Sequence, residues 1–108
     1  MKETNVLKLC LMALSEAGCM AFRNNVGALA DKTGRLIRYG VGGKGGSDLI
    51  GLAPDGIFFA VEVKTATGKP TPEQLTFIAA IRRQGGRAGV ARSPEEAVAL
   101  ALGQKDSA

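Results

Sequence analysis

Two apolar runs, residues 48–52 and 57–64, are separated by one short turn, and this constrains the fold more than any other feature of the sequence. The second run is rich in β-branched and aromatic residues, which favour strands. The turn segment Pro54-Asp55-Gly56 fits a three-residue hairpin loop, in which a type I turn is followed by glycine in the left-handed conformation. The sequence therefore predicts two adjacent antiparallel strands.

The length of this turn determines which side chains meet across the two strands. Opposed residue numbers sum to a constant, so Asp48 faces Glu62, with Cβ atoms roughly 4.5 to 5.5 Å apart on one face of the sheet. Lys64 projects from the same face, because side chains alternate with a period of two. A two-residue loop would instead place the two carboxylates on opposite faces. Carboxylates held this close repel each other unless a proton, a lysine or a cation compensates.

This pair of carboxylates has the chemistry of a site for a hard divalent cation. Mg²⁺ is commonly held by one or two carboxylates together with phosphate oxygens of a substrate, which fits Asp48, Glu62 and the backbone carbonyl of Val63. Lys64 would then orient or help to deprotonate a metal-bound water and offset the charge of the reacting phosphate. The plain alternative is a solvated strand end with a surface ion pair, which contributes little.

The amino-acid composition excludes several kinds of catalytic site and of scaffold. None of the 108 residues is histidine, which excludes imidazole-based triads and most catalytic zinc sites. Two cysteines, Cys10 and Cys19, are too few for a disulfide-stapled scaffold and indicate reduced thiols in a cytoplasmic protein. The formal net charge of +4 is a mild hint of a polyanionic partner. No apolar stretch reaches the roughly 18 to 20 residues of a membrane span, so we expect no membrane partner.

The remaining segments predict one α/β domain around one sheet. Capping motifs open two helices, at Thr71-Pro72-Glu73-Gln74 and Ser93-Pro94-Glu95-Glu96. The expected elements are a helix over 3–17, a hairpin with arms at 20–29 and 35–39, helices over 71–84 and 93–103, a strand over 87–92, and a frayed tail over 104–108.

The segment Gly40–Gly46 holds five glycines and contains the pattern G-x-G-x-x-G. A dinucleotide site needs a helix after this pattern, whereas a strand is expected here, so no nucleotide cofactor is predicted. What remains is a flexible loop bearing Lys44. It is either a simple connection or a segment that lies along a phosphate backbone.

Several segments together resemble the virus-type replication-repair nuclease (VRR-NUC) domain, a branch of the PD-(D/E)XK nuclease superfamily. They are Arg23-x-Asn25-x-Gly27, Gly46-Ser47-Asp48-Leu49-Ile50-Gly51, Glu62-Val63-Lys64-Thr65, Thr71-x-x-Gln74-x-x-Phe77 and Gly85-Gly86-x-Ala88-Gly89-Val90-Ala91. Ser47 stands where the family has proline. The resemblance implies a single domain over 1–108 with a restriction-endonuclease-like core, in which a helix precedes a mixed four- to five-stranded sheet and two further helices.

The resemblance also implies a Mg²⁺- or Mn²⁺-dependent endonuclease that hydrolyses phosphodiester bonds in DNA with a metal-activated water. Asp48 and Glu62 would bind the metal and Lys64 would serve the attacking water. Gln74 would be a further catalytic residue, although the capping box also explains it. Glu3 corresponds to an acidic residue near the metals, although an acid at a helix N-terminus is equally explained by the helix dipole.

DNA backbone contacts are expected from four cations that a solvated surface explains about as well: Lys44, Lys69, Arg23 and Arg38. A chain this short cannot enclose a branched duplex, so we expect a homodimer, as stand-alone viral members of the family form. Two sites suit paired cuts in branched, Holliday-junction-like DNA, in a bacterial or phage-infected cell. The alternatives are a non-catalytic nucleic-acid-binding module on the same fold and a plain structural domain.

Overall fold

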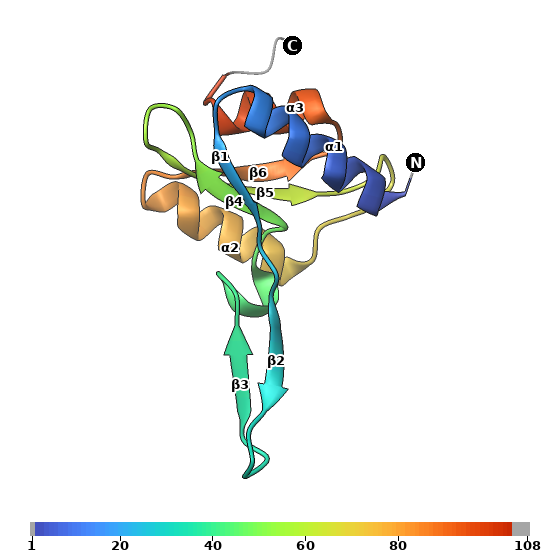
Figure 1. Cartoon of the computed structure of the whole chain (residues 1–108), viewed down its shortest axis with the longest axis vertical. Helices are drawn as coiled ribbons and strands as arrows, with labels where there is room; N and C mark the ends of the chain where they lie inside the picture. The colour runs from blue at the N-terminus through green and yellow to red at the C-terminus, as the bar shows by residue number, and fades with distance from the viewer. Residues whose placement is uncertain (1, 105–108) are drawn as a thin grey trace.

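The computed structural model describes residues 2–104, which form a layered α/β body and a projecting hairpin (Figure 1). The elements in chain order are α1 (Glu3–Glu16), β1 (Met20–Arg23), β2 (Gly27–Ala30), β3 (Leu36–Tyr39), the 3-10 helix η1 (Gly43–Gly45), β4 (Leu49–Leu52), β5 (Phe58–Val63), α2 (Pro72–Arg83), β6 (Arg87–Ala91) and α3 (Pro94–Ala101). The predicted α/β class, with one helix before a mixed sheet and two further helices, is confirmed.

The central sheet has the strand order β1-β4-β5-β6. β4 runs antiparallel to both β1 and β5, while β6 runs parallel to β5. Ile50 opposes Ala60, and Gly56 has a φ of +82°, as the three-residue hairpin loop requires. The register predicted from the turn is therefore confirmed for β4 and β5.

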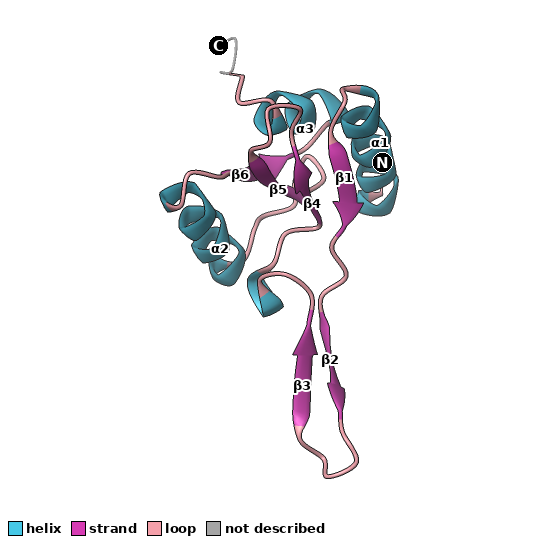
Figure 2. Ribbon diagram, turned by 60° about the vertical axis from the view of Figure 1, so that its left-hand side comes forward, coloured by secondary structure: helices cyan, strands magenta, loops and turns pink. Residues whose placement is uncertain are grey.

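The helices cover the two faces of the sheet (Figure 2). α1 and α3 lie together on one face, where Leu14, Leu49 and Phe59 belong to the larger apolar core. α2 lies on the other face and buries Ile78 against Ala60 in a smaller cluster. Because β5 carries buried residues on both of its faces, its end is enclosed by both layers.

The segment 20–29 differs from the expectation of one long hairpin strand. Its first part, β1, pairs with β4 in the central sheet, and only β2 pairs with β3. The chain changes partner at Asn24, whose backbone N–H donates to Asp48 O at 2.8 Å and whose side chain binds the backbone of Val41. Residues 26–41 therefore form a separate two-stranded projection, which we call the arm (Figure 1).

The glycine-rich segment is a packed turn, whereas a flexible loop was expected. Gly42 has a φ of +87°, which a side chain would rarely allow. Gly45 lies against the backbone of Glu73 on α2, so closely that a Cβ at residue 45 would collide with it. Glycine is thus needed here for the approach of η1 to α2, and the strand β4 follows as predicted.

Three further expectations concern the membrane, the thiols and the tail. Within residues 2–104, no helix has both the length and the apolar character that crossing a bilayer requires. Cys10 and Cys19 are free and buried, and burial is the main cause that raises the pKa of both thiols. Of the tail expected to fray, 105–108 lie outside the described residues.

Candidate active site

Glu62, the residue before the last in β5, is the centre of the site. It is 1% exposed, although it carries a carboxylate. Its Oε1 accepts a hydrogen bond from Gln74 Nε2 at 3.0 Å and lies 3.8 Å from Lys64 Nζ. Its Oε2 is buried and has no hydrogen-bond partner among the described residues. A buried carboxylate oxygen without a partner is costly, so this atom calls for a ligand that the chain itself does not supply.

Asp48 directly precedes β4, where the confirmed register places it opposite Glu62. Its Oδ2 accepts a hydrogen bond from the backbone N–H of Val63 at 2.8 Å. This bond fixes the Asp48 side chain across the end of β5. The structure thus brings together the four predicted catalytic residues, Asp48, Glu62, Lys64 and Gln74, while their chemical roles stay predictions.

The electrostatics of Glu62 follow from this crowding. Burial is the largest cause that raises the pKa of Glu62, and the neighbouring Asp48 carboxyl raises it further, to about 8. The Lys64 ammonium lowers this pKa and Glu3 contributes a smaller increase. Without a bound cation, the buried carboxyl therefore keeps its proton at neutral pH.

Gln74 joins the first turn of α2 to the site. Thr71 Oγ1 accepts a hydrogen bond from the backbone N–H of Gln74 at 3.2 Å, and Gln74 Oε1 accepts one from the N–H of Thr71 at 2.8 Å. The amide nitrogen of the same side chain is then left to donate to Glu62. The predicted capping box and the contact with the acidic residue therefore coexist.

Two predicted metal ligands are less well defined by the geometry. Glu3 lies exposed in the first turn of α1, and its charge reaches Glu62 only as a minor effect on the pKa. Between residues 2 and 104, no three acidic, cysteine or histidine side chains cluster closely enough to hold a metal. The ligand roles of Glu3 and of the Val63 carbonyl therefore stay predictions.

Sequence reasoning missed two residues that hold the site in place. Asn24 Nδ2 donates to the carbonyls of Val41 and Ser47, at 2.8 and 2.9 Å, which fixes the chain just before Asp48. Arg92 donates to the carbonyls of Thr65 and Gly68, at 2.5 and 2.6 Å, and so holds the loop that follows Lys64. Their partners lie 17 to 27 residues away in sequence, so no local pattern indicates these contacts.

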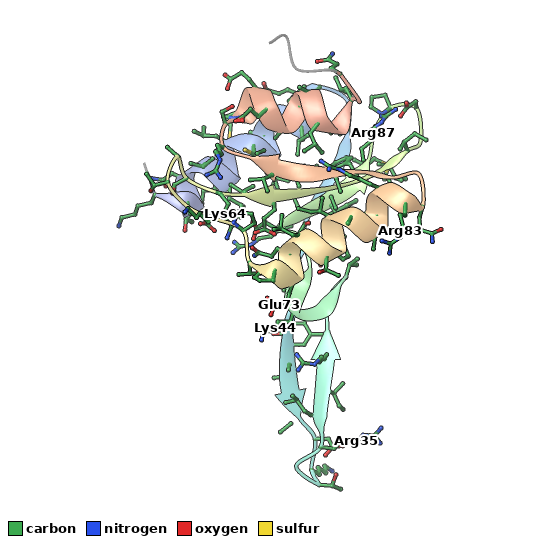
Figure 3. All side chains as sticks on the ribbon, turned by 180° about the vertical axis from the view of Figure 1, so that it is seen from behind. Arg35, Lys44, Lys64, Glu73, Arg83 and Arg87 are labelled. Carbon is green, nitrogen blue, oxygen red and sulfur yellow. The ribbon has the colours of Figure 1, made fainter. Side chains whose placement is uncertain are left out.

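The four predicted DNA-contacting cations, Lys44, Lys69, Arg23 and Arg38, are all exposed. Lys44 and Arg38 line one hollow of about 290 Å³ at the base of the arm. Lys44 also borders a second hollow of about 470 Å³ between η1 and α2, together with Glu73 and Phe77. Figure 3 shows Lys44 beside Glu73, at the junction of the arm and the α/β body. Two of the four cations thus share a surface, and their contacts with DNA stay predictions.

Comparisons with known proteins agree with this architecture. The family model described as the VRR-NUC domain matches residues 1–95. One similar solved structure, described as a VRR_NUC domain, shares 26% sequence identity with this chain and superposes with a TM-score of 0.62, and the match covers 88% of each chain. No curated protein sequence matches the chain.

Proposed function

Because this chain belongs to the VRR-NUC family and has its nuclease-type fold, we propose that it is a metal-dependent endonuclease that hydrolyses phosphodiester bonds in DNA. The observation that carries the proposal is the buried, unpartnered Oε2 of Glu62 at the point where Asp48, Lys64 and Gln74 meet. A site that keeps such an atom away from water is adapted to a ligand with positive charge.

The residues present fit Mg²⁺ or Mn²⁺. The available donors are carboxylate oxygens of Asp48 and Glu62 with the nearby backbone carbonyl of Val63, and hard divalent cations prefer such oxygen ligands. A cation there would also relieve the repulsion that raises the pKa of Glu62. When bound, the ion polarises the phosphodiester and lowers the pKa of water.

The chain's own residues prepare the site for the reaction. The Gln74 amide nitrogen donates to Glu62 Oε1, which leaves Oε2 available to coordinate a cation. The Lys64 side chain is 13% exposed, so its ammonium lies at the boundary between the buried carboxylate and solvent. We assign Lys64 Nζ two tasks, orienting the attacking water and offsetting the negative charge that develops on the phosphoryl group.

We further propose that the substrate is branched, Holliday-junction-like DNA, and that the protein acts as a homodimer in the cytoplasm of a bacterial or phage-infected cell, with no nucleotide cofactor. The net charge of +4 and the hollow lined by Lys44 and Arg38 support a polyanionic substrate. A strand, β4, follows the glycine-rich turn, which supports the absence of a nucleotide site.

The test is cleavage of a DNA panel, linear, forked and four-way, in Mg²⁺ or Mn²⁺. Lys64→Ala is expected to lower the cleavage rate by about 100-fold or more, because it removes the group that orients water and offsets charge. Lys8→Ala, which removes the same charge from an exposed position on α1, should cut like the wild type.

Two outcomes would refute the proposal. Equal cutting by the wild type and Lys64→Ala would remove Lys64 from the mechanism. Binding to DNA without cutting any member of the panel, together with no thermal stabilisation by Mn²⁺, would instead favour a non-catalytic nucleic-acid-binding module on this fold.

A further inference from the structure

The arm carries large apolar side chains in an exposed position. Leu29, Ile37 and Tyr39 are 66%, 53% and 46% exposed, and neither sheet face of the arm is covered by a helix (Figures 1 and 2). A two-stranded hairpin with no further packing is only marginally stable in water. The arm therefore carries apolar side chains that are typical of a buried strand, although no other described part of the chain covers them.

The two faces of the arm differ in chemistry. Leu29 opposes Ile37, and Tyr39 opposes Gly27, so these three large side chains project from one face. A Cβ at residue 27 would collide with the Tyr39 hydroxyl, which shows that the ring lies over this glycine. Arg38 projects from the opposite face and lines a hollow with Lys44. We call the side that carries Leu29, Ile37 and Tyr39 the apolar face.

The shape of the arm is held at both ends. At its tip, Asp31 Oδ1 accepts hydrogen bonds from the backbone N–H groups of Thr33 and Arg35, at 2.8 and 2.9 Å. At its base, Asn24 binds the carbonyl of Val41 and that of Ser47. The apolar face is therefore presented by an ordered turn and an anchored base, which lowers the entropic cost of binding a partner.

We propose that the apolar face of the arm binds the same face of a second copy of this chain. The strand residues that make up this face, Gly27, Leu29, Ile37 and Tyr39, carry no charge. An uncharged apolar surface is complementary to itself, as a two-fold symmetric interface requires. DNA fits this face poorly, because the cation Arg38 points to the other side.

The apolar face supplies part of the area that such an interface needs. Its three large side chains, Leu29, Ile37 and Tyr39, are all exposed. At roughly 100 Å² each they offer on the order of 300 Å² per copy, about half of the roughly 600 Å² per partner that specific interfaces bury. The apolar face would therefore form the centre of the interface, and the polar residues around it would supply the rim.

The inference rests on the homodimer in the proposed function and names its surface. Asn24 connects the base of the arm to the backbone of Asp48. Pairing of two arms would therefore hold two candidate sites at a defined separation, while the face with Arg38 and Lys44 stays open to a phosphate backbone. The arm thus becomes the element that sets the spacing of paired cuts.

The test measures mass in solution, without DNA or metal, by light scattering over a dilution series. The wild type should have twice the chain mass of 11.2 kDa, and the double variant L29E/I37E should be monomeric. The matched control is M12E/L75E, which places the same two charges on similarly exposed apolar sites on α1 and α2 and should stay dimeric. Circular dichroism checks that each variant is folded.

A cysteine variant keeps the test decisive if the charged variant does not fold. Cys10 and Cys19 are buried, so Leu29→Cys adds an accessible thiol that should form a disulfide-linked dimer under mild oxidation, whereas Leu75→Cys should not. Equal cross-linking of both variants would overturn the assignment of the arm.

The remaining outcomes show whether the arm interface fails alone or together with the proposed homodimer. A wild type that is dimeric together with a folded, dimeric L29E/I37E would overturn the arm and leave the homodimer standing. A wild type that is monomeric at every concentration would overturn both, yet it would leave DNA cleavage to be judged by the Lys64→Ala experiment alone. If that monomer also loses DNA binding on L29E/I37E substitution, the apolar face contacts nucleic acid instead.

Discussion

Replacing Glu62 with glutamine should make the metal-free protein more stable at alkaline pH. The folded state raises the pKa of Glu62 from 4.5 to about 8, chiefly through burial. Between these values the folded chain binds a proton that the unfolded chain has released, so the free energy of unfolding falls as pH rises. Glutamine has the same shape and no charge, and it removes this dependence.

The size of the effect follows from the same pKa. One pKa unit corresponds to 1.36 kcal/mol, so the rise from 4.5 to about 8 amounts to about 5 kcal/mol for a fully sealed site. Water reaching the charged side chain reduces this value, and we expect about 3 kcal/mol. For a domain near 100 residues this corresponds to a difference in Tm of roughly 12 to 24 °C between Glu62→Gln and the wild type at about pH 9.

The assay is thermal and urea unfolding from about pH 5 to about pH 9 in the presence of a chelator. The difference in stability between Glu62→Gln and the wild type should be small at the acid end and grow steadily toward the alkaline end. Glu16→Gln, which neutralises an exposed carboxylate at the end of α1, is the matched control and should show a flat difference.

If the free energies of unfolding of Glu62→Gln and the wild type differ by a constant amount across this pH range, the reasoning is refuted. The ionisation of residue 62 would then have no effect on the free energy of unfolding. A wild type that is the more stable protein at the alkaline end would refute the reasoning as well. Adding Mn²⁺ extends the test: it should stabilise the wild type most where Glu62 is ionised and leave Glu62→Gln unchanged.

Other substitutions separate structural from catalytic roles. Gln74→Ala should lower the DNA cleavage rate by about 10-fold and the free energy of unfolding by about 1 kcal/mol. Thr71→Ala should lower only the free energy of unfolding, because it removes the cap and keeps the contact between Gln74 and the buried carboxylate. Equal cleavage rates of the two variants would contradict a role for the Gln74 amide. Asn24→Ala should cost about 2 to 3 kcal/mol in urea unfolding, because two carbonyls and one N–H lose their partner, and a loss below about 0.5 kcal/mol would show that water replaces them. Mn²⁺ at about 100 times its Kd should raise the free energy of unfolding by about 3 kcal/mol in the wild type and not in Asp48→Asn, measured before and after chelation; equal gains would exclude Asp48 as a ligand.

The parts of the fold that the sequence predicted depend on local chemistry. Proline and glycine in the turn at 54–56 determined the loop type, and the loop type determined the register that places Asp48 opposite Glu62. The capping box at Thr71 likewise marked the start of α2. Each of these signals acts within a few residues, where the number of possible conformations is small.

The parts that were not predicted depend on contacts between distant residues. The division of 20–29 into β1 and β2 follows from Asn24, whose partners lie beyond residue 40. The packed glycine turn depends on α2, which begins only at Pro72. The candidate site was predicted from its own strand pair, whereas the residues that hold it in place, Asn24 and Arg92, belong to long-range contacts that no local pattern indicates.

The double use of the Gln74 amide has a consequence for how the site is assembled. Its oxygen accepts from Thr71 and its nitrogen donates to Glu62, so the amide has a single orientation and a flipped rotamer would break both bonds. Fraying of the first turn of α2 would therefore release Glu62 at the same moment. The rate at which the Gln74 backbone amide exchanges with deuterium should then report how often the bond between Gln74 and Glu62 opens. One peptide proton thus measures the fraction of molecules in which the site is assembled.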